Sequence, residues 1–156
     1  MNKNPFPHLV FVYGTLQQGS YNNPVMTGHQ QKDARLVGPA TTLQKFFMAD
    51  GGFPRVSTQV TGSFPVSERA TSYFGQIRGE LWELNDSAFK ACDRLESHPT
   101  FYRRAEVPVT LNGTRKRHVA WIYLIVEPFP AYQAMQKNRD GVLAWTSGSW
   151  TNKEVL

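Results

Sequence analysis

Two apolar runs separated by an Asn-Gly pair constrain the fold of this 156-residue chain most strongly. The runs extend from Val107 to Leu111 and from Val119 to Val126, and Asn112-Gly113 directly follows the first. Asn-Gly favours positive φ at both central residues of a tight turn, so the pattern predicts a β-hairpin. The fold must therefore accommodate at least one antiparallel strand pair.

Other strand signals precede the hairpin. Leu9 to Tyr13 is a continuous apolar run that Gly14 interrupts, as expected of a buried strand. Residues from Tyr73 to Leu84 alternate in part between apolar and polar side chains. Weaker strand candidates lie at 35–37 and 43–48. Because strands outnumber helices, the sequence predicts an α+β fold with a curled or barrel-like sheet and helices at its side.

One helix is signalled clearly between the run at 73–84 and the hairpin. Asn85 or Asp86 can cap its start, and Pro99 prevents its continuation. Its apolar residues recur at helical spacing and form one stripe, which consists of Phe89, Cys92 and Leu95. Glu96 follows Cys92 by four residues, so we expect its carboxylate to share this buried side.

Two shorter helices are also expected. Asn23 is the candidate cap of the first, with Pro24 at the first helical position. The second would span Pro130 to Asn138 and end before Gly141. The stretch from Val60 to Thr71 has too little periodicity for a helix or a strand, so it is predicted to be a loop.

Length and cysteine content favour a single domain of residues 1–156. A chain of this length can bury a core without disulfides or metals, and Cys92, the lone cysteine, cannot form an internal disulfide. No apolar run reaches the roughly 18–20 residues of a membrane helix, and the N-terminal residues do not resemble a signal peptide. We therefore expect a cytoplasmic protein that does not contact a membrane.

The charge is mildly basic, at +5 with a pI near 9.5. Basic residues gather at Arg103-Arg104 and at 115–118, where the second group falls in an expected turn. Such groups usually form a solvated surface, so nucleic-acid binding is the less favoured interpretation. Attraction of anionic small molecules remains open.

Glu96 is the first candidate for chemistry. A carboxylate on the buried side of a helix is costly unless it is paired or neutral, and the helix C-terminus further disfavours its charge. Both effects would raise its pKa toward the range of a proton-exchanging group at neutral pH. The alternative is a structural ion pair with Arg94, Arg103 or Arg104, and periodicity alone favours that alternative.

The segment after the first strand, from Val12 to Gly19, is the second candidate. A buried strand that ends at Gly14 can expose successive backbone N–H groups, which bind anions. Gly14 and Gly19 have the spacing of a phosphate-binding loop, but Ser20-Tyr21 follow where Lys and Ser or Thr are required. A nucleotide triphosphatase is therefore rejected, and on its own the segment is as compatible with a plain turn.

The sequence lacks the residue patterns of several other kinds of catalytic site. The chain has no G-x-S-x-G elbow and no dinucleotide fingerprint, and Cys92 lies on an apolar stripe, where thiols are usually inert. The histidines show no metal-ligand spacing and are expected in surface or turn positions; they are His8, His29, His98 and His118. We expect neither a metal nor a cofactor.

Four ordered motifs carry a family resemblance. They are Val-Tyr-Gly-Thr-Leu at 12–16 with Gly19 and Asn22, Arg-Gly-Glu-Leu-Trp-Glu-Leu at 78–84, the segment 93–104, and Trp-Ile-Tyr at 121–123. Together they resemble the gamma-glutamylcyclotransferase-like superfamily. Five residues separate Glu96 from Tyr102, and this long interval is similar to the gamma-glutamylamine cyclotransferase branch.

The resemblance implies a small mixed β-barrel with flanking helices and an enzyme of the lyase or acyltransferase type. It would release 5-oxoproline and an amine or amino acid from a γ-glutamyl compound, with Glu96 as general acid and base. The backbone N–H groups of Gly14, Thr15 and Leu16 would bind the substrate α-carboxylate. Three tyrosines would wall the pocket and donate hydrogen bonds, namely Tyr13, Tyr102 and Tyr123. The 144–150 segment departs from the family pattern, so no site residue is assigned there.

Two alternatives stay open. One is another acyl-transfer or γ-glutamyl-removing activity that uses the same Glu96. The other is a non-catalytic member of this fold that binds a small anionic ligand, nucleic acid or a protein partner. Joint retention of Glu96, Tyr102 and the 13–16 segment favours the enzyme, which we expect to be a monomer or a small homo-oligomer.

Overall fold

The computed structural model describes residues 4–50, 54–57 and 74–126. Its strands are β1 (His8–Val12), β2 (Ala34–Asp50), β3 (Pro54–Ser57), β4 (Phe74–Leu84), β5 (Tyr102–Leu111) and β6 (Arg117–Ile125). Its helices are α1 (Asn23–Thr27), the single 3₁₀ turn η1 (His29–Gln31) and α3 (Asp86–Leu95). The expected helix at 130–138 and the expected loop at 60–71 lie outside the described residues.

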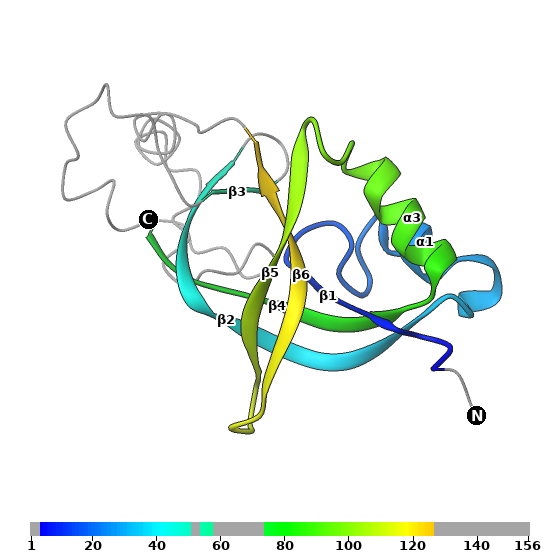
Figure 1. The fold of residues 1–156 in the computed structure, drawn as a ribbon, viewed down its shortest axis with the longest axis horizontal. Coiled ribbons are helices and arrows are strands. Elements are labelled where there is room, and N and C mark those ends of the chain that lie inside the picture. Colours follow the sequence, from blue (N-terminus) through cyan, green and yellow to red (C-terminus); the bar gives the residue numbers. More distant parts are fainter. Residues whose placement is uncertain (1–3, 51–53, 58–73, 127–156) are drawn as a thin grey trace.

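The strands form one sheet that closes on itself. Its order is β3-β2-β4-β1-β6-β5, and a further pairing of β5 with β2 completes the barrel. β1 runs parallel to β6, whereas the other pairs are antiparallel. In Figure 1, α1 and α3 lie together at one side of the sheet. The predicted small mixed barrel with flanking helices is confirmed.

The barrel core is mainly apolar, and Thr42 of β2 is a polar side chain buried within it. Its largest completely buried side chains include Phe11, Phe46, Leu81 and Ile122. Phe11 belongs to the apolar run that precedes Gly14, which β1 confirms as a buried strand. Burial of these side chains is the main favourable term for folding, and it fixes β1 at the centre of the sheet.

The two weak strand candidates at 35–37 and 43–48 belong to the one long strand β2. Its pairing with β4 shifts register between Leu36 and Gly38 and again between Thr41 and Lys45. At the second shift, the buried Thr42 hydroxyl accepts a hydrogen bond from the Ile77 N–H (2.9 Å). These irregularities bend β2 so that it can pair with three partners and close the barrel.

The expected cap of α3 is confirmed. The side chain of Asn85 accepts a hydrogen bond from the Ala88 N–H at 2.8 Å. The expected cap of α1 is wrong, because Asn22 and not Asn23 occupies that position and makes no side-chain cap. The reason lies in the neighbouring turn. The Asn22 side chain donates to the Thr15 hydroxyl and that of Asn23 to the Leu16 carbonyl, each at 2.8 Å.

The hairpin between β5 and β6 is confirmed, but its connection is longer than a two-residue turn. Residues 112–116 join the strands, and within them Gly113 has a positive φ of 77° while Asn112 does not. Asn112 is tied to β2 instead, since its N–H donates to the Pro39 carbonyl and its side chain accepts from the Thr41 hydroxyl. These contacts hold Asn112 outside the left-handed region.

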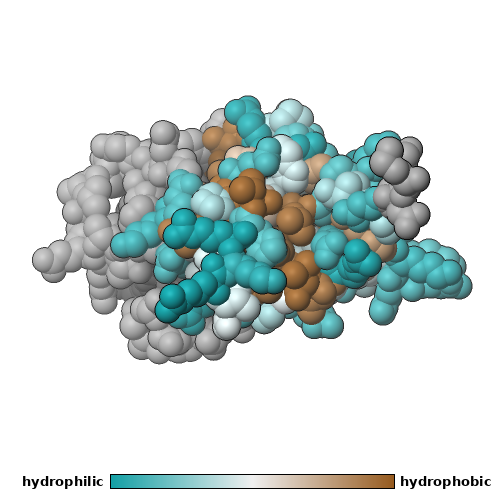
Figure 2. All heavy atoms as spheres, turned by 60° about the horizontal axis from the view of Figure 1, so that its bottom comes forward, coloured by the Kyte–Doolittle hydropathy of each residue, from teal (hydrophilic) through white to brown (hydrophobic). Residues whose placement is uncertain are grey.

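The basic hairpin end is exposed at Arg115, Lys116 and Arg117. Figure 2 views the molecule from the lower side of Figure 1, where this end lies, and shows hydrophilic residues over much of the face with apolar residues gathered near its middle. The hairpin end therefore belongs to a hydrophilic surface. No helix in the described part of the chain is long and apolar enough to span a bilayer.

Candidate active site

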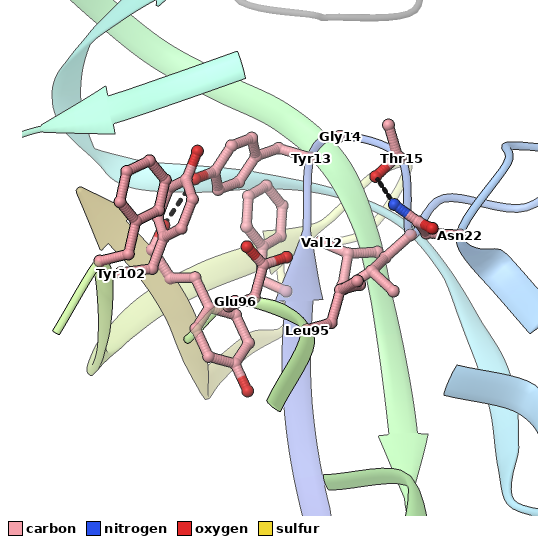
Figure 3. Close-up of a pocket in the computed structure, with 12 residues that line it drawn as sticks. Val12, Tyr13, Gly14, Thr15, Asn22, Leu95, Glu96 and Tyr102 are labelled. Carbon is pink, nitrogen blue, oxygen red and sulfur yellow. Dashed lines mark hydrogen bonds between the residues drawn. The ribbon is translucent and has the colours of Figure 1, made fainter. Parts of the chain in front are cut away.

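A cavity of about 370 Å³ opens where β1, α3, β5 and β6 meet. All seven predicted site residues line it, namely Glu96, Tyr13, Gly14, Thr15, Leu16, Tyr102 and Tyr123. Five further lining residues were not predicted as site residues, namely Phe11, Val12, Asn22, Leu95 and Phe101. Figure 3 shows the Glu96 carboxylate directed into the space between Tyr102 on one side and Val12 and Leu95 on the other. The fold thus places the expected carboxylate and the turn after β1 at one cavity.

The backbone carbonyl groups and the backbone N–H groups of the turn after β1 differ in their hydrogen bonding. The carbonyls of Tyr13, Gly14, Thr15 and Leu16 all accept hydrogen bonds from residues 17 to 23. Among the described residues, none accepts a hydrogen bond from the backbone N–H groups of residues 14, 15 or 16. A run of N–H groups without internal acceptors is a site suited to an anion such as a carboxylate.

Two side chains that were not predicted as site residues hold this turn. The buried Gln17 side chain donates to the Tyr13 carbonyl at 2.9 Å. Glu80 accepts from the Gln18 N–H at 2.7 Å and from the Trp82 indole at 3.1 Å. Beside it, a Cβ added at Gly79 would lie 2.2 Å from the Val12 carbonyl oxygen. The Gly-Glu pair of β4 is therefore a structural support of the turn.

Glu96 caps the C-terminus of α3, and its backbone is fixed on both sides. Its N–H donates to the Cys92 carbonyl (2.9 Å), and its carbonyl accepts from the Tyr102 N–H (3.2 Å). The side chain is half-buried, and within the described residues its carboxylate has no hydrogen-bond or ion-pair partner. Burial raises the pKa of Glu96 from 4.5 to about 7.

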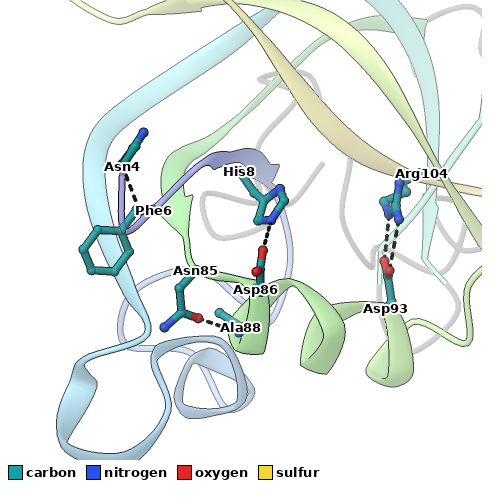
Figure 4. Close-up of polar contacts among 8 residues, drawn as sticks. All are labelled: Asn4, Phe6, His8, Asn85, Asp86, Ala88, Asp93 and Arg104. Carbon is teal, nitrogen blue, oxygen red and sulfur yellow. Dashed lines mark hydrogen bonds and ion pairs between the residues drawn. The ribbon is translucent and has the colours of Figure 1, made fainter. Parts of the chain in front are cut away.

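The ion-pair alternative for Glu96 does not hold in the described part of the chain. Arg104 pairs with Asp93 instead, through two hydrogen bonds of 2.9 and 3.2 Å, and Arg94 and Arg103 are exposed. Figure 4 shows Asp93 at the end of α3 facing Arg104. The guanidinium lies over the rings of Phe89 and Trp121, at 4.4 and 4.6 Å from their centres.

Asp93 is also bound from the barrel side. The Tyr123 hydroxyl donates to Asp93 Oδ1 at 2.6 Å. Partial burial by itself raises the pKa of Asp93, but the hydrogen bonds from Arg104 and Tyr123 and the charge of Arg104 outweigh it and hold the pKa below its ordinary value. Asp93 therefore remains an anion that fastens the end of α3 to β5 and β6.

The tyrosines differ from expectation in how they use their hydroxyl groups. Tyr13 donates to the Tyr123 carbonyl at 2.6 Å, and Tyr123 donates to Asp93. Both protons are thus held within the protein, which corrects the expectation that these two residues donate to a substrate. Burial raises the pKa of both above the ordinary value, so they are neutral walls of the cavity. Tyr102 packs edge-on against Phe101, with ring centres 5.2 Å apart.

The sulfur of Cys92 offers no nucleophile. The residue is completely buried, and burial raises its pKa to about 12, so the thiol is protonated at neutral pH. Its place on the apolar side of α3 agrees with the expected packing role. Over residues 4–50, 54–57 and 74–126, no group of three or more His, Cys, Asp or Glu side chains is arranged to hold a metal ion.

Comparison with known proteins decides the family. The model of a family described as gamma-glutamyl cyclotransferase, AIG2-like matches residues 10–152. This chain belongs to that family. The predicted superfamily is confirmed, on a match that covers both the turn after β1 and Glu96.

Two relatives are 31% and 28% identical to the chain over the residues that align. The protein named "Putative gamma-glutamylcyclotransferase" from Methanocaldococcus jannaschii is 31% identical over 118 residues, or 76% of this chain and 84% of that protein. The gamma-glutamylaminecyclotransferase of cattle is 28% identical over 114 residues, which cover 73% of this chain and 63% of the cattle protein. The chain thus matches less than two thirds of the cattle protein's length.

Solved structures support the fold. The crystal structure of a mouse AIG2-like protein superposes with a TM-score of 0.60 at 22% identity, covering 76% of this chain and 77% of the mouse chain. The helices and the barrel are therefore arranged as in the mouse AIG2-like protein.

Proposed function

We propose that the protein is a cyclotransferase that converts a γ-glutamyl compound into 5-oxoproline and a free amine or amino acid. The observation that carries this proposal is the cavity itself. One carboxylate with a pKa of about 7 faces the same space as a turn whose N–H groups suit a carboxylate ligand. Family membership supports the same reaction class.

The substrate supplies its own nucleophile. Its α-nitrogen forms a bond to its γ-carbonyl carbon, and the bond from that carbon to the leaving nitrogen breaks. In the sum, the attacking ammonium gives up two protons and the leaving nitrogen receives them. Glu96 carries these protons one at a time, as base toward the attacking nitrogen and as acid toward the leaving nitrogen. Ring closure within one bound molecule gains strongly from proximity.

The turn after β1 would bind the substrate α-carboxylate. The N–H groups of Gly14, Thr15 and Leu16 supply the donors, and Gln17 and Glu80 keep the turn in shape. The buried walls formed by Tyr13, Tyr102 and Tyr123 exclude water from the reacting centre. Because water is excluded, the γ-glutamyl carbonyl carbon reacts with the substrate's own α-amine and is not hydrolysed.

The test is a panel of γ-glutamyl amines and γ-glutamyl dipeptides, assayed for 5-oxoproline with the purified protein. We expect turnover by the natural chain and a loss of about 100-fold or more in Glu96→Gln, the usual range for loss of a general acid and base. Glu106→Gln is the matched control, because Glu106 is an exposed carboxylate on β5 outside the cavity.

Two outcomes would contradict the proposal. Activity that survives in a folded Glu96→Gln variant removes the role assigned to this carboxylate. Absence of 5-oxoproline across the whole panel, together with binding of γ-glutamyl compounds, favours a non-catalytic ligand-binding member of the fold.

A further inference from the structure

Glu96 and the donor turn, which is the turn after β1 with the N–H groups of residues 14–16, reach the cavity from different elements. Glu96 caps the end of α3, whereas the donor turn directly follows β1 (Figure 3). In the proposed reaction the turn holds the α-carboxylate while Glu96 meets the reacting nitrogen. The placement of these two parts relative to each other therefore matters, because a shift of about 1 Å can cost about 100-fold in rate.

The start of the donor turn is attached to β6 by the Tyr13 side chain. β1 pairs with β6 at Val10 and Trp121, and β1 ends at Val12. Beyond this end, the Tyr13 hydroxyl donates to the Tyr123 carbonyl at 2.6 Å. Both tyrosines are buried, so water competes little for this hydrogen bond. The Tyr13 hydroxyl thus extends the attachment of β1 to β6 as far as the donor turn.

The end of α3 is attached to the same strand by the Tyr123 hydroxyl. This hydroxyl donates to Asp93 Oδ1 at 2.6 Å, and Asp93 precedes Glu96 by three residues. One turn earlier in α3, Phe89 packs against Trp121 of β6, with ring centres 6.1 Å apart. Of these two contacts with β6, the hydrogen bond to Asp93 is the nearer to Glu96 along the helix.

We infer that Tyr123 is a positioning residue, which holds the donor turn through its carbonyl and Glu96 through its hydroxyl. This inference rests on the proposed function. Both hydrogen bonds meet at one residue of β6, so they place the two reacting parts of the site relative to a single strand. Tyr123 acts through Tyr13 and Asp93. Its own proton is directed away from the substrate, because Asp93 accepts it and does not line the cavity.

Loss of each hydroxyl should change a different kinetic constant. Tyr123→Phe keeps the ring and the carbonyl but loses the bond to Asp93, so Glu96 shifts while the donor turn stays in place. Because Glu96 acts in the reaction step, kcat should fall about tenfold or more, with KM within about twofold of the natural value. Tyr13→Phe loosens the turn, which binds substrate and transition state alike. Its KM should therefore rise about fivefold, with kcat within about twofold.

The experiment measures both constants from 5-oxoproline formation, with the γ-glutamyl compound that the natural chain converts fastest. Each kcat is referred to the folded fraction, which circular dichroism gives, so that a loss of stability does not count as a loss of rate. Tyr21→Phe is the matched control, because it removes the same hydroxyl group from a side chain that is 91% exposed and outside the cavity lining. Both of its constants should equal those of the natural chain.

Hydrogen exchange tests the attachment of Glu96 without any turnover. The Glu96 N–H donates to the Cys92 carbonyl, and the Tyr102 N–H donates to the Glu96 carbonyl, so both amides report how firmly Glu96 is held. In Tyr123→Phe these two amides should exchange about fivefold faster relative to the amides of β4, because one hydrogen bond near them is lost. In Tyr21→Phe the relative rates should not change.

An unchanged kcat in folded Tyr123→Phe overturns the inference. A rise in KM that exceeds the fall in kcat also overturns it, because the hydroxyl would then bind the substrate itself. If Tyr123→Phe does not fold, Asp93→Asn tests the same attachment from α3, since it leaves one oxygen for three hydrogen bonds from Arg104 and Tyr123. Its kcat should fall with KM kept, and an unchanged kcat contradicts the inference.

The failure of the proposed function is a separate result. If no γ-glutamyl compound yields 5-oxoproline, the proposed function fails, and hydrogen exchange alone decides whether Tyr123 holds Glu96 in place. Faster exchange of the Glu96 and Tyr102 amides in Tyr123→Phe then supports the positioning role. Equal exchange in Tyr123→Phe and the natural chain would show that Tyr123 does not fix Glu96.

Discussion

Two carboxylates at the end of α3, only three residues apart, have opposite surroundings. Asp93 faces β5 and β6, where Arg104 and Tyr123 saturate it with hydrogen bonds and lower its pKa. Glu96 faces the cavity, where no described residue pairs with it and burial raises its pKa to about 7. The same chemical group is thus a permanent anion in one place and a proton carrier in the other.

The difference shows how the chain keeps a reactive carboxylate near neutral pH. Arg104 is close enough in sequence to serve either carboxylate, and its guanidinium makes two hydrogen bonds to Asp93. Its position over Phe89 and Trp121 keeps the guanidinium on the side of α3 away from the cavity lining. Asp93 therefore contributes to the site by occupying the cation that would otherwise lower the pKa of Glu96.

The largest expected effect concerns pH. If the ionised form of Glu96 starts the reaction, kcat/KM should fall by about 50-fold between pH 7 and pH 5, because the carboxylate is half ionised at pH 7 and about 1% ionised at pH 5. The measurement is 5-oxoproline formation at limiting substrate over pH 5 to 8. A rate that stays constant over this range would remove the distinction between the two carboxylates.

Asp93→Asn should lower the stability of the fold. Loss of hydrogen bonds to a charged partner lowers the free energy of unfolding by about 2–3 kcal/mol at pH 7. The folded-state pKa of Asp93 is depressed, so its contribution is present above the unfolded-state pKa and is lost as pH falls through the folded-state pKa. The difference in unfolding free energy between Asp93→Asn and the natural chain should therefore decrease at acidic pH.

Urea denaturation at pH 7 and at pH 3 measures this effect. Asp86→Asn is the control, because the Asp86 side chain is 79% exposed and its pair with His8 lies at the start of α3. We expect less than about 1 kcal/mol from that change. Equal losses of unfolding free energy in the two variants would mean that the Asp93–Arg104 pair stabilises the fold no more than the exposed Asp86 pair does.

Glu96→Gln should have the opposite and smaller effect on stability. A raised folded-state pKa makes the contribution of Glu96 fully present below its unfolded-state pKa, near 4.5, and lost as pH rises through about 7. At pH 8 the natural chain keeps a buried anion, so the variant should be more stable by about 1–2 kcal/mol. The difference is limited to this range because partial solvation of the Glu96 side chain reduces the free-energy cost of burying its charge. A variant less stable than the natural chain at pH 8 would contradict this expectation.

Local sequence signals predicted much of the fold and the main parts of the site. The Asn85 cap, the apolar stripe and Pro99 bounded α3, and helical periodicity placed Glu96 on its inner side. The apolar run before Gly14 predicted β1 and the turn that follows it. These features depend on residues near one another in the chain, which is why periodicity and capping rules reach them.

Contacts between distant segments were out of reach. Glu80 supports the turn at Gln18 across 62 residues, and Asp93 competes for Arg104 because β5 passes the end of α3. The same holds for Tyr13, whose hydroxyl proton goes to a carbonyl 110 residues away. The continuous β2 was hidden because its register shifts break the alternation by which a strand is recognised.

Titration of Glu96 shows whether this cavity carboxylate has a pKa near neutrality. Carboxyl ¹³C NMR of the glutamate-labelled protein, assigned with Glu96→Gln, follows this one side chain from pH 3 to pH 9. We expect a titration midpoint at about pH 7 for Glu96. A midpoint near the ordinary 4.5 would contradict it.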